Sequence, residues 1–219
     1  MSQGLSTPHA TEDDAAQASA CDIVRHLEEA YRTRGRSVLT VCGGRSVALV
    51  LRHLRLAHPV TVIATDERCV PLDSPERNDR ALIDHFGESA VIRAPHSDDP
   101  RRDAEEWAAR LWQMGTPDVA LLSMADDGHV ASLFPRRSTL DSQSPVVIEW
   151  DSPKPPSVRV SLSAARIRCI PHRLVLAIGR DKAAMIDQIR QGHDVPATRI
   201  KPTRWYLDSA ASSANGGGR

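Results

Sequence analysis

The sequence lacks an excess of charge of either sign, because its 28 basic and 28 acidic residues balance to a formal net charge of zero. A chain without net charge has no global attraction for nucleic acid or for an anionic membrane surface. We therefore expect neither nucleic acid nor membrane as a partner. Any anionic ligand must be held by a local cluster of cations.

Cysteine pairs and long apolar runs are also missing. No Cys-x-x-Cys pair occurs, so neither a zinc ribbon nor a redox motif is indicated, and the thiols are expected to be reduced. No run approaches the roughly 20 apolar residues that cross a bilayer, and residues 1–20 lack the apolar core of a secretory signal. A soluble, cytoplasmic protein is expected. The four cysteines are Cys21, Cys42, Cys69 and Cys169.

A length of 219 residues fits one α/β domain better than two very small ones. We place this single domain at residues 12–208. The first 11 residues are polar and the last 11 are mostly small, so both tails, 1–11 and 209–219, are expected to be disordered.

Apolar, β-branched runs alternate with stretches of helical spacing along the whole domain. Strands are predicted at 37–41, 60–64, 119–122, 146–150, 159–163, 174–178 and 205–207, and helices at 16–35, 46–56, 79–86, 99–114 and 182–189. This alternation is typical of an α/β fold with a mostly parallel sheet and helices on both faces.

The first predicted strand ends at Cys42-Gly43-Gly44, and Ser46 follows at the start of a helix. Such a turn presents backbone N–H groups and the positive end of a helix dipole to an anion. The Gly-x-Gly-x-x-Gly and Gly-Lys-Ser/Thr patterns are absent, which disfavours a dinucleotide or Walker-type site. A plain tight turn between strand and helix is the alternative.

Two further strands end in polar residues. Asp66-Glu67-Arg68 follows the strand at 60–64 and is either a polar site or a solvated loop. Asn78 is expected to cap the next helix. Asp127-Gly128-His129 follows the strand at 119–122, where open α/β sheets place their chemistry. A histidine beside a carboxylate is a candidate general base, although Asp-Gly is also a common turn.

Taken in order, these segments resemble the glucosamine-6-phosphate isomerase/6-phosphogluconolactonase family, and within it the lactonase branch. The resemblance runs from about residue 37 to residue 208 and covers several spaced motifs. They are Gly43-Gly44, Asp66-Glu67-Arg68-Cys69-Val70-Pro71 with Asn78, the segment from Asp127 to Pro135, Lys154-Pro155-Pro156 with Arg159, Gly179 with Lys182, and Trp205-Tyr206-Leu207-Asp208.

The resemblance implies a modified Rossmann-like fold of the NagB/RpiA/CoA transferase-like type. It also implies hydrolysis of 6-phospho-D-glucono-1,5-lactone in the oxidative pentose phosphate pathway, without metal or organic cofactor, by a monomer or homodimer. By this resemblance His129 is the general base, Asp127 supports it, and Asp66 and Arg68 line the sugar end of the pocket. The 6-phosphate is held by Gly43, Gly44, Ser46, Arg159 and Lys182.

The chain departs from the family pattern at several positions. Ser123-Met124-Ala125 stands where family members usually have Gly-Met-Gly, and Arg136 replaces a glycine after Phe134-Pro135. At the first turn Gly43-Gly44-Arg45-Ser46-Val47 stands where the family usually has Gly-Gly-Ser-Thr-Pro. A positive φ at Ser123 or Ala125 would be strained, and Arg45 and Arg136 either add phosphate ligands or narrow the pocket.

Two alternatives remain beside the lactonase. A glucosamine-6-phosphate isomerase/deaminase shares the fold, but that branch has a glutamate five residues beyond the histidine, where this chain has Phe134, and a tyrosine where it has Arg68. A non-catalytic homologue would keep the fold and bind sugar phosphates but would not catalyse a reaction. A reactive thiol at Cys42 or Cys69, which flank the predicted site, is a further alternative.

Overall fold

The computed structural model describes residues 5–213 and contains a six-stranded main sheet. Its strands are β1 (Val38–Val41), β2 (Thr61–Ala64), β4 (Val91–Ile92), β5 (Val119–Ser123), β8 (His172–Ala177) and β9 (Arg204–Leu207). They stand in the order β4-β2-β1-β5-β8-β9, and every neighbouring pair is parallel. The four central strands are apolar because both of their faces are covered.

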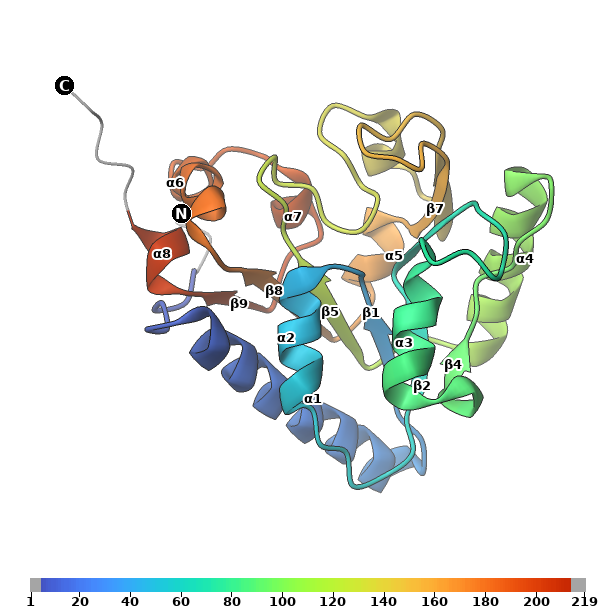
Figure 1. The fold of residues 1–219 in the computed structure, drawn as a ribbon, viewed down its shortest axis with the longest axis horizontal. Coiled ribbons are helices and arrows are strands. Elements are labelled where there is room, and N and C mark those ends of the chain that lie inside the picture. The colour runs from blue at the N-terminus through green and yellow to red at the C-terminus, as the bar shows by residue number, and fades with distance from the viewer. Residues whose placement is uncertain (1–4, 214–219) are drawn as a thin grey trace.

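Helices cover this sheet on both faces, which confirms the predicted α/β fold. They are α1 (Glu12–Arg34), α2 (Arg45–His53), α3 (Asn78–Phe86), α4 (Pro100–Met114), α5 (Ala164–Arg168), α6 (Ala183–Arg190), α7 (Pro196–Arg199) and α8 (Ser209–Ser212). In Figure 1, α1 and α2 pack together on the near side of the sheet and α5 lies behind it. α1 begins at a Thr11/Asp14 capping box and ends at Gly35 in the left-handed conformation.

A second, antiparallel sheet was not predicted. It consists of β3 (Asp66–Arg68), β7 (Arg159–Leu162) and β6 (Val146–Glu149), in that order. The polar residues 66–68 are therefore not a solvated loop, because their backbone pairs with β7. All four residues of β7 are buried, whereas the alternating sequence predicts a half-buried strand.

The described parts of the two tails correct the expectation of disorder. His9 bridges to Asp208 beside the end of β9, and Asp208 caps α8 by accepting a hydrogen bond from the N–H of Ala211 at 2.9 Å. Ser209 Oγ donates to the carbonyl of Ala10 at 2.6 Å, so each tail orders the other. The expectation for residues 1–4 and 214–219 lies outside the described residues. Within residues 5–213, no helix is long and apolar enough to cross a membrane.

The strand order places a topological switch between β1 and β5. From β1 the chain moves to β2 on one side, and from β5 it moves to β8 on the other. The loops that leave the carboxyl ends of β1 and β5 diverge, and a crevice at this point is where open α/β sheets bind ligands.

Candidate active site

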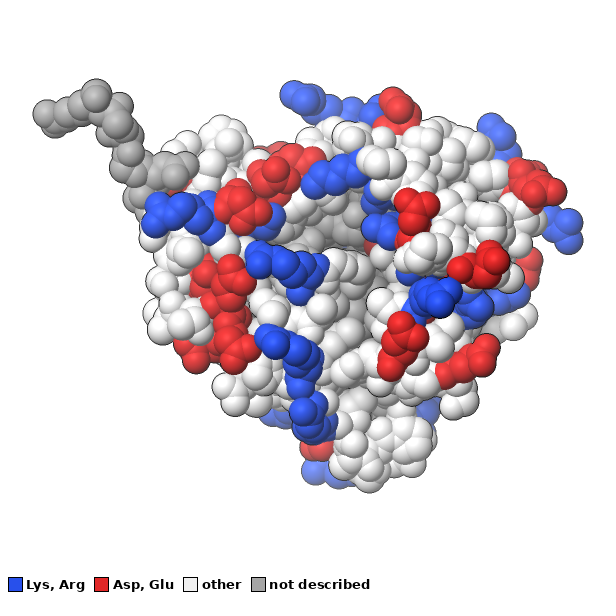
Figure 2. Space-filling view, viewed as in Figure 1, with Lys and Arg blue, Asp and Glu red and all other residues white. Residues whose placement is uncertain are grey.

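A cavity of about 410 Å³ lies at this switch point. In Figure 2, basic side chains border a hollow above the position of α2. The segments that form it follow β1, β2, β5 and β8, together with the start of β7. Eight of the nine predicted site residues line it, namely Gly43, Gly44, Ser46, Asp66, Arg68, His129, Arg159 and Lys182. Asp127, the ninth, does not line the cavity and contacts His129.

His129 is held by Asp127 through two hydrogen bonds. Its ring Nδ1 lies 2.6 Å from Asp127 Oδ1, and its backbone N–H donates to the same oxygen at 3.0 Å. Since an ionised carboxylate can only accept, the neutral imidazole carries its proton on Nδ1 and keeps the lone pair on Nε2. Partial burial raises the pKa of Asp127, but the bonds from His129 outweigh this and lower it to about 2. Asp127 is therefore a permanent anion at neutral pH.

Phe134 packs against the ring of His129. The ring centroids are 4.5 Å apart, and Phe134 is only 2% exposed. The Arg159 guanidinium lies over the ring of Phe134, with its Cζ 5.9 Å from the ring centroid. The imidazole is thus oriented by a carboxylate at Nδ1 and by an apolar ring beside it.

One wall of the cavity is suited to an anion. Gly43, Gly44 and Ser46 form the β1–α2 turn, and the first turn of α2 has no side-chain cap, so its N–H groups are available. Lys182 lies on the same cavity and pairs with Asp181 at 2.7 Å. Arg45 stands at the rim, 3.8 Å from Glu12. Helix-start amides and two cations therefore converge here.

Arg68 and Arg159 are cross-strand partners on β3 and β7, and both face the cavity. Arg159 Nε donates to the carbonyl of Pro156 at 3.1 Å, and its Nη2 donates to the carbonyl of Lys154 at 2.8 Å. Burial lowers the pKa of Arg159, and the negative charge of Asp66 opposes this effect. Arg159 thus anchors the 154–156 loop as well as lining the cavity, and no group within residues 5–213 accepts a hydrogen bond from its Nη1.

Glu67 organises the start of α3, and the expectation that Asn78 caps this helix is wrong. Glu67 is fully buried and accepts hydrogen bonds from the N–H groups of Asn78 and Asp79 at 2.7 and 2.8 Å. Burial raises the pKa of Glu67 to about 7, against the opposing charge of Arg77. The Asn78 side chain points the other way, and its Nδ2 donates to the carbonyl of Asp66 at 2.8 Å.

Gly43→Ala is expected to destabilise the protein by about 1–3 kcal/mol, because the added methyl overpacks a buried contact. A Cβ at Gly43 would lie 2.1 Å from Asn78 Oδ1, although the backbone there does not have a positive φ. Chemical denaturation measures the effect. In an Asn78→Ala background the same change should be much less damaging, and an equal loss in both backgrounds would contradict this explanation.

Two of the departures from the family pattern are free of strain and one is not. Within residues 5–213, the non-glycine residues with positive φ are Ala131, Arg136 and Lys201, so Ser123 and Ala125 sit in ordinary backbone conformations. Arg136 has φ 60°, which explains a glycine preference at that position. Arg136 is not among the residues that line the cavity.

The two cysteines near the site are not activated nucleophiles. Burial and the charge of Asp66 raise the pKa of Cys42 to about 12, and burial also raises the pKa of Cys69 to about 11. Both sulfurs are therefore protonated thiols at neutral pH, and a thiolate mechanism is disfavoured. In the described part of the chain, no group of three or more His, Cys, Asp or Glu side chains is placed to hold a metal ion.

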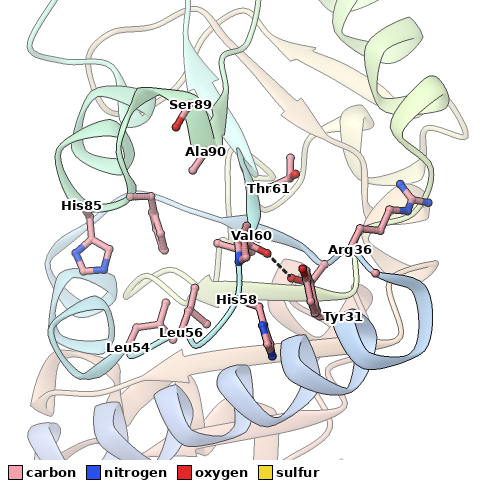
Figure 3. A pocket seen from close by; sticks show the side chains of 14 residues that line it. Tyr31, Arg36, Leu54, Leu56, His58, Val60, Thr61, His85, Ser89 and Ala90 are labelled. Atoms are coloured by element: carbon pink, nitrogen blue, oxygen red, sulfur yellow. Dashed lines mark hydrogen bonds between the residues drawn. The ribbon is translucent and has the colours of Figure 1, made fainter.

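A larger cavity, of about 730 Å³, lies at the opposite edge of the sheet, where β1 and β2 begin. Figure 3 shows its lining, which includes Tyr31, Leu54, His58 and His85. Tyr31 and His58 stack with their ring centroids 4.3 Å apart. It contains none of the predicted site residues, so the smaller cavity is the candidate active site.

Several residues that line the site were not predicted as site residues. Asn78 is expected from the sequence only as a helix cap, and the sequence predicts no ligand contact for Lys154, Asp181 or Ser123. The sequence indicates Asp181 as a site residue only through its position next to Lys182. The pairing of strands and the paths of the loops decide which side chains face the cavity. Neither depends on neighbouring residues alone, so neither leaves a local pattern in the sequence.

The chain is similar in sequence to proteins of one known family. Residues 10–208 match the family model described as glucosamine-6-phosphate isomerases/6-phosphogluconolactonase. A 6-phosphogluconolactonase of Streptomyces coelicolor is 30% identical over 94% of this chain and 92% of its own length.

Solved structures of two different activities share the fold. The 6-phosphogluconolactonase of Thermotoga maritima aligns with a TM-score of 0.82 at 21% identity, covering 92% of this chain and 99% of that one. A monomeric glucosamine-6-phosphate deaminase aligns with a TM-score of 0.81 at 18% identity, covering 95% and 98%. The fold alone does not separate the two activities, and side chains of the site must do so.

Proposed function

This chain belongs to the glucosamine-6-phosphate isomerase/6-phosphogluconolactonase family, and we propose that it hydrolyses 6-phospho-D-glucono-1,5-lactone to 6-phosphogluconate. The single observation that favours the lactonase over the deaminase is the contact between Phe134 and His129. The deaminase branch has a glutamate at this position, five residues beyond the histidine. Here a buried phenyl ring stands instead, and it offers no acid or base for opening a sugar ring.

His129 acts as the general base in this proposal. Its Nε2 takes a proton from the water that attacks the lactone carbonyl, and the same proton then goes to the ring oxygen as the C–O bond breaks. The anionic Asp127 holds the ring and stabilises the imidazolium that forms. A lactone is an activated ester, so no covalent nucleophile is required. Arg68, which faces the cavity, is suited to the negative charge that develops on the carbonyl oxygen.

The 6-phosphate binds at the other end of the cavity. Its oxygens accept hydrogen bonds from the first-turn N–H groups of α2, from the Ser46 hydroxyl and from Lys182. The free Nη1 of Arg159 adds a further donor. Asp66 also lines the cavity, and its carboxylate is suited to the hydroxyl groups of the sugar, which need acceptors. Although the chain has no net charge, the cations and N–H groups of this wall suffice to bind the phosphate dianion.

The purified protein is expected to accelerate hydrolysis of freshly prepared 6-phosphogluconolactone well above the spontaneous rate. Proton release measures the rate, and the unphosphorylated glucono-1,5-lactone serves as the matched substrate. The phosphorylated lactone should have the higher kcat/KM, because only it uses the α2 and Lys182 wall. Equal kcat/KM values for the two lactones would contradict the proposed phosphate site.

The same preparation separates the alternatives. Ammonia release from glucosamine 6-phosphate without lactone turnover would establish the deaminase. Tight binding of 6-phosphogluconate by calorimetry without any turnover would establish a non-catalytic homologue. Activity that survives EDTA is expected, since the proposed mechanism uses only side chains and water.

We place this reaction in the cytoplasm, as part of the oxidative pentose phosphate pathway, and expect a monomer or homodimer. The four cysteines are unpaired, with Cys21 and Cys169 exposed, and free exposed thiols are typical of a reducing compartment. Light scattering coupled to gel filtration measures the oligomeric state.

A further inference from the structure

A buried hydrogen bond joins the turn that carries His129 to the strand that carries Asp66. Ser132 Oγ donates to Asp66 Oδ2 at 2.6 Å, and the two residues are 0% and 4% exposed. Asp66 lies on β3 of the antiparallel sheet, whereas Ser132 follows β5 of the parallel sheet by nine residues. This contact, together with the hydrogen bond from the Ser132 N–H to Ser161 Oγ, joins the turn after β5 to the antiparallel sheet.

The carboxylate of Asp66 is buried, and one of its two oxygens, Oδ1, has no hydrogen-bond donor within residues 5–213. Ser132 is the hydrogen-bond donor to its side chain, and no other side-chain or backbone donor within residues 5–213 reaches Oδ1. Its backbone carbonyl is fixed separately by Asn78. No basic side chain in the described chain forms an ion pair with it, although Arg159 lies near enough for their charges to interact. Within residues 5–213, Oδ1 is not one of the fully buried polar atoms without a partner, so it is open to the cavity, where a hydroxyl group of a ligand can donate to it.

The turn that presents Ser132 is held in an unusual backbone conformation. Ala131, directly before it, has φ 53°, which L-residues adopt rarely and at a cost of about 1 kcal/mol or more. Val130 and Leu133 bridge across the turn. This conformation directs the Ser132 side chain back toward β3, while His129, three residues earlier, faces the cavity. The base and Asp66 are thereby fixed relative to each other.

We infer that Ser132 is a positioning residue of this enzyme. Its hydroxyl occupies Oδ2 of Asp66 and holds the carboxylate so that Oδ1 accepts a hydrogen bond from a hydroxyl group of the sugar, which the lactone and the open-chain 6-phosphogluconate both carry. In the lactone this bond also sets the position of the ring against Nε2 of His129. This inference rests on the proposed function, because it requires a sugar in the cavity. It assigns to Ser132 a role that acts only through Asp66.

Ser132→Ala tests the inference. The Kd for 6-phosphogluconate, measured by calorimetry, is expected to rise about tenfold, as for the loss of one hydrogen bond to a charged group. KM for the lactone should rise with it, and kcat should fall less. Ser161→Ala is the control for losing a buried hydroxyl beside the same turn: Ser161 Oγ accepts a hydrogen bond from the Ser132 backbone N–H at 3.4 Å and donates to the carbonyl of Leu162, but within residues 5–213 it forms no hydrogen bond with the Asp66 side chain. Its Kd should change less than threefold.

A double-mutant cycle distinguishes positioning from a general structural effect. In an Asp66→Ala background, Ser132→Ala should change the Kd less than twofold, because the contact is already absent. Ser132→Cys keeps the shape of the side chain with a weaker donor, so it should lie between serine and alanine and serves as the probe if alanine impairs folding. Equal effects of Ser132→Ala and Ser161→Ala, or multiplying effects of Ser132→Ala and Asp66→Ala, would overturn the inference.

Failure of the proposed function has a different signature. In that case the wild-type protein would neither bind 6-phosphogluconate nor hydrolyse the lactone. If it does both, and if Asp66→Ala weakens binding while the cycle shows no coupling, only the role of Ser132 is wrong.

Discussion

His129→Ala is expected to lower kcat by about 10²–10⁴-fold, the range that a positioned general base contributes. KM should change little, because the phosphate wall and Asp66 bind the substrate independently of the imidazole. Stopped-flow or pH-stat measurement of lactone hydrolysis gives both constants. The fold should be retained, since His129 lies at the cavity surface and its loss buries no unpaired charge. Turnover near the wild-type rate would show that His129 is not the base.

The chain offers a matched control for this substitution. His53 on α2 pairs with Asp13 at 2.8 Å, a second histidine–carboxylate pair that lies outside the candidate site. His53→Ala should leave kcat unchanged within twofold. If it reduced kcat as much as His129→Ala, a loss of general stability rather than of a base would explain both results.

Asp127→Asn separates orientation from proton transfer. The amide can donate to Nδ1, which favours the tautomer with its proton on Nε2, and it cannot stabilise an imidazolium. We expect kcat to fall by at least about tenfold while KM stays within threefold.

The pKa of Asp127 is about 2, below the ordinary value of 3.8, so the carboxylate and its interaction with His129 are lost only as the pH falls through this range. An acid limb of the rate profile above pH 4 therefore does not belong to Asp127.

Much of the main sheet can be predicted from local patterns. The run Val119–Leu122 is apolar and buried on both faces, and the observed β5 extends it by only one residue. The turns at Gly43-Gly44 and Asp127-Gly128-His129 follow such strands directly, so strand prediction also places their residues at one edge of the sheet. Because parallel strands align their carboxyl ends, the predicted residues that follow β1, β5 and β8 share one cavity, namely Gly43, Gly44, Ser46, His129 and Lys182.

Features that depend on long-range pairing could not be predicted in this way. Asp66–Arg68 is too short and polar to be recognised as a strand, and it is one because β7 pairs with it from more than 90 residues away. Asn78 has the right residue type for a helix cap, but the distant carboxylate of Glu67 takes that role. The direction of a side chain within a turn also leaves no local sequence pattern, so the sequence predicts no role for Ser132.

Lys182→Met is expected to raise KM for 6-phosphogluconolactone by about 10- to 100-fold, with kcat changed far less. Methionine keeps the apolar stem and removes the charge. Lys182 is the better probe of this wall, because Arg159 also donates to carbonyls of the 154–156 loop and its loss would disturb that loop. The unphosphorylated lactone is the decisive comparison: its kcat/KM should not change, since it presents no phosphate to Nζ.

The matched control is Lys201→Met, since Lys201 is exposed and is not among the residues that line the cavity. It should leave both substrates unaffected. In the free protein Lys182 pairs with Asp181 at 2.7 Å, so the phosphate must take over from a carboxylate that is already in place. Binding of the phosphorylated lactone should therefore weaken with rising salt, and this salt dependence should be smaller in Lys182→Met. An equal loss of kcat/KM for both lactones would instead indicate that Lys182 supports the fold or the chemistry rather than the phosphate.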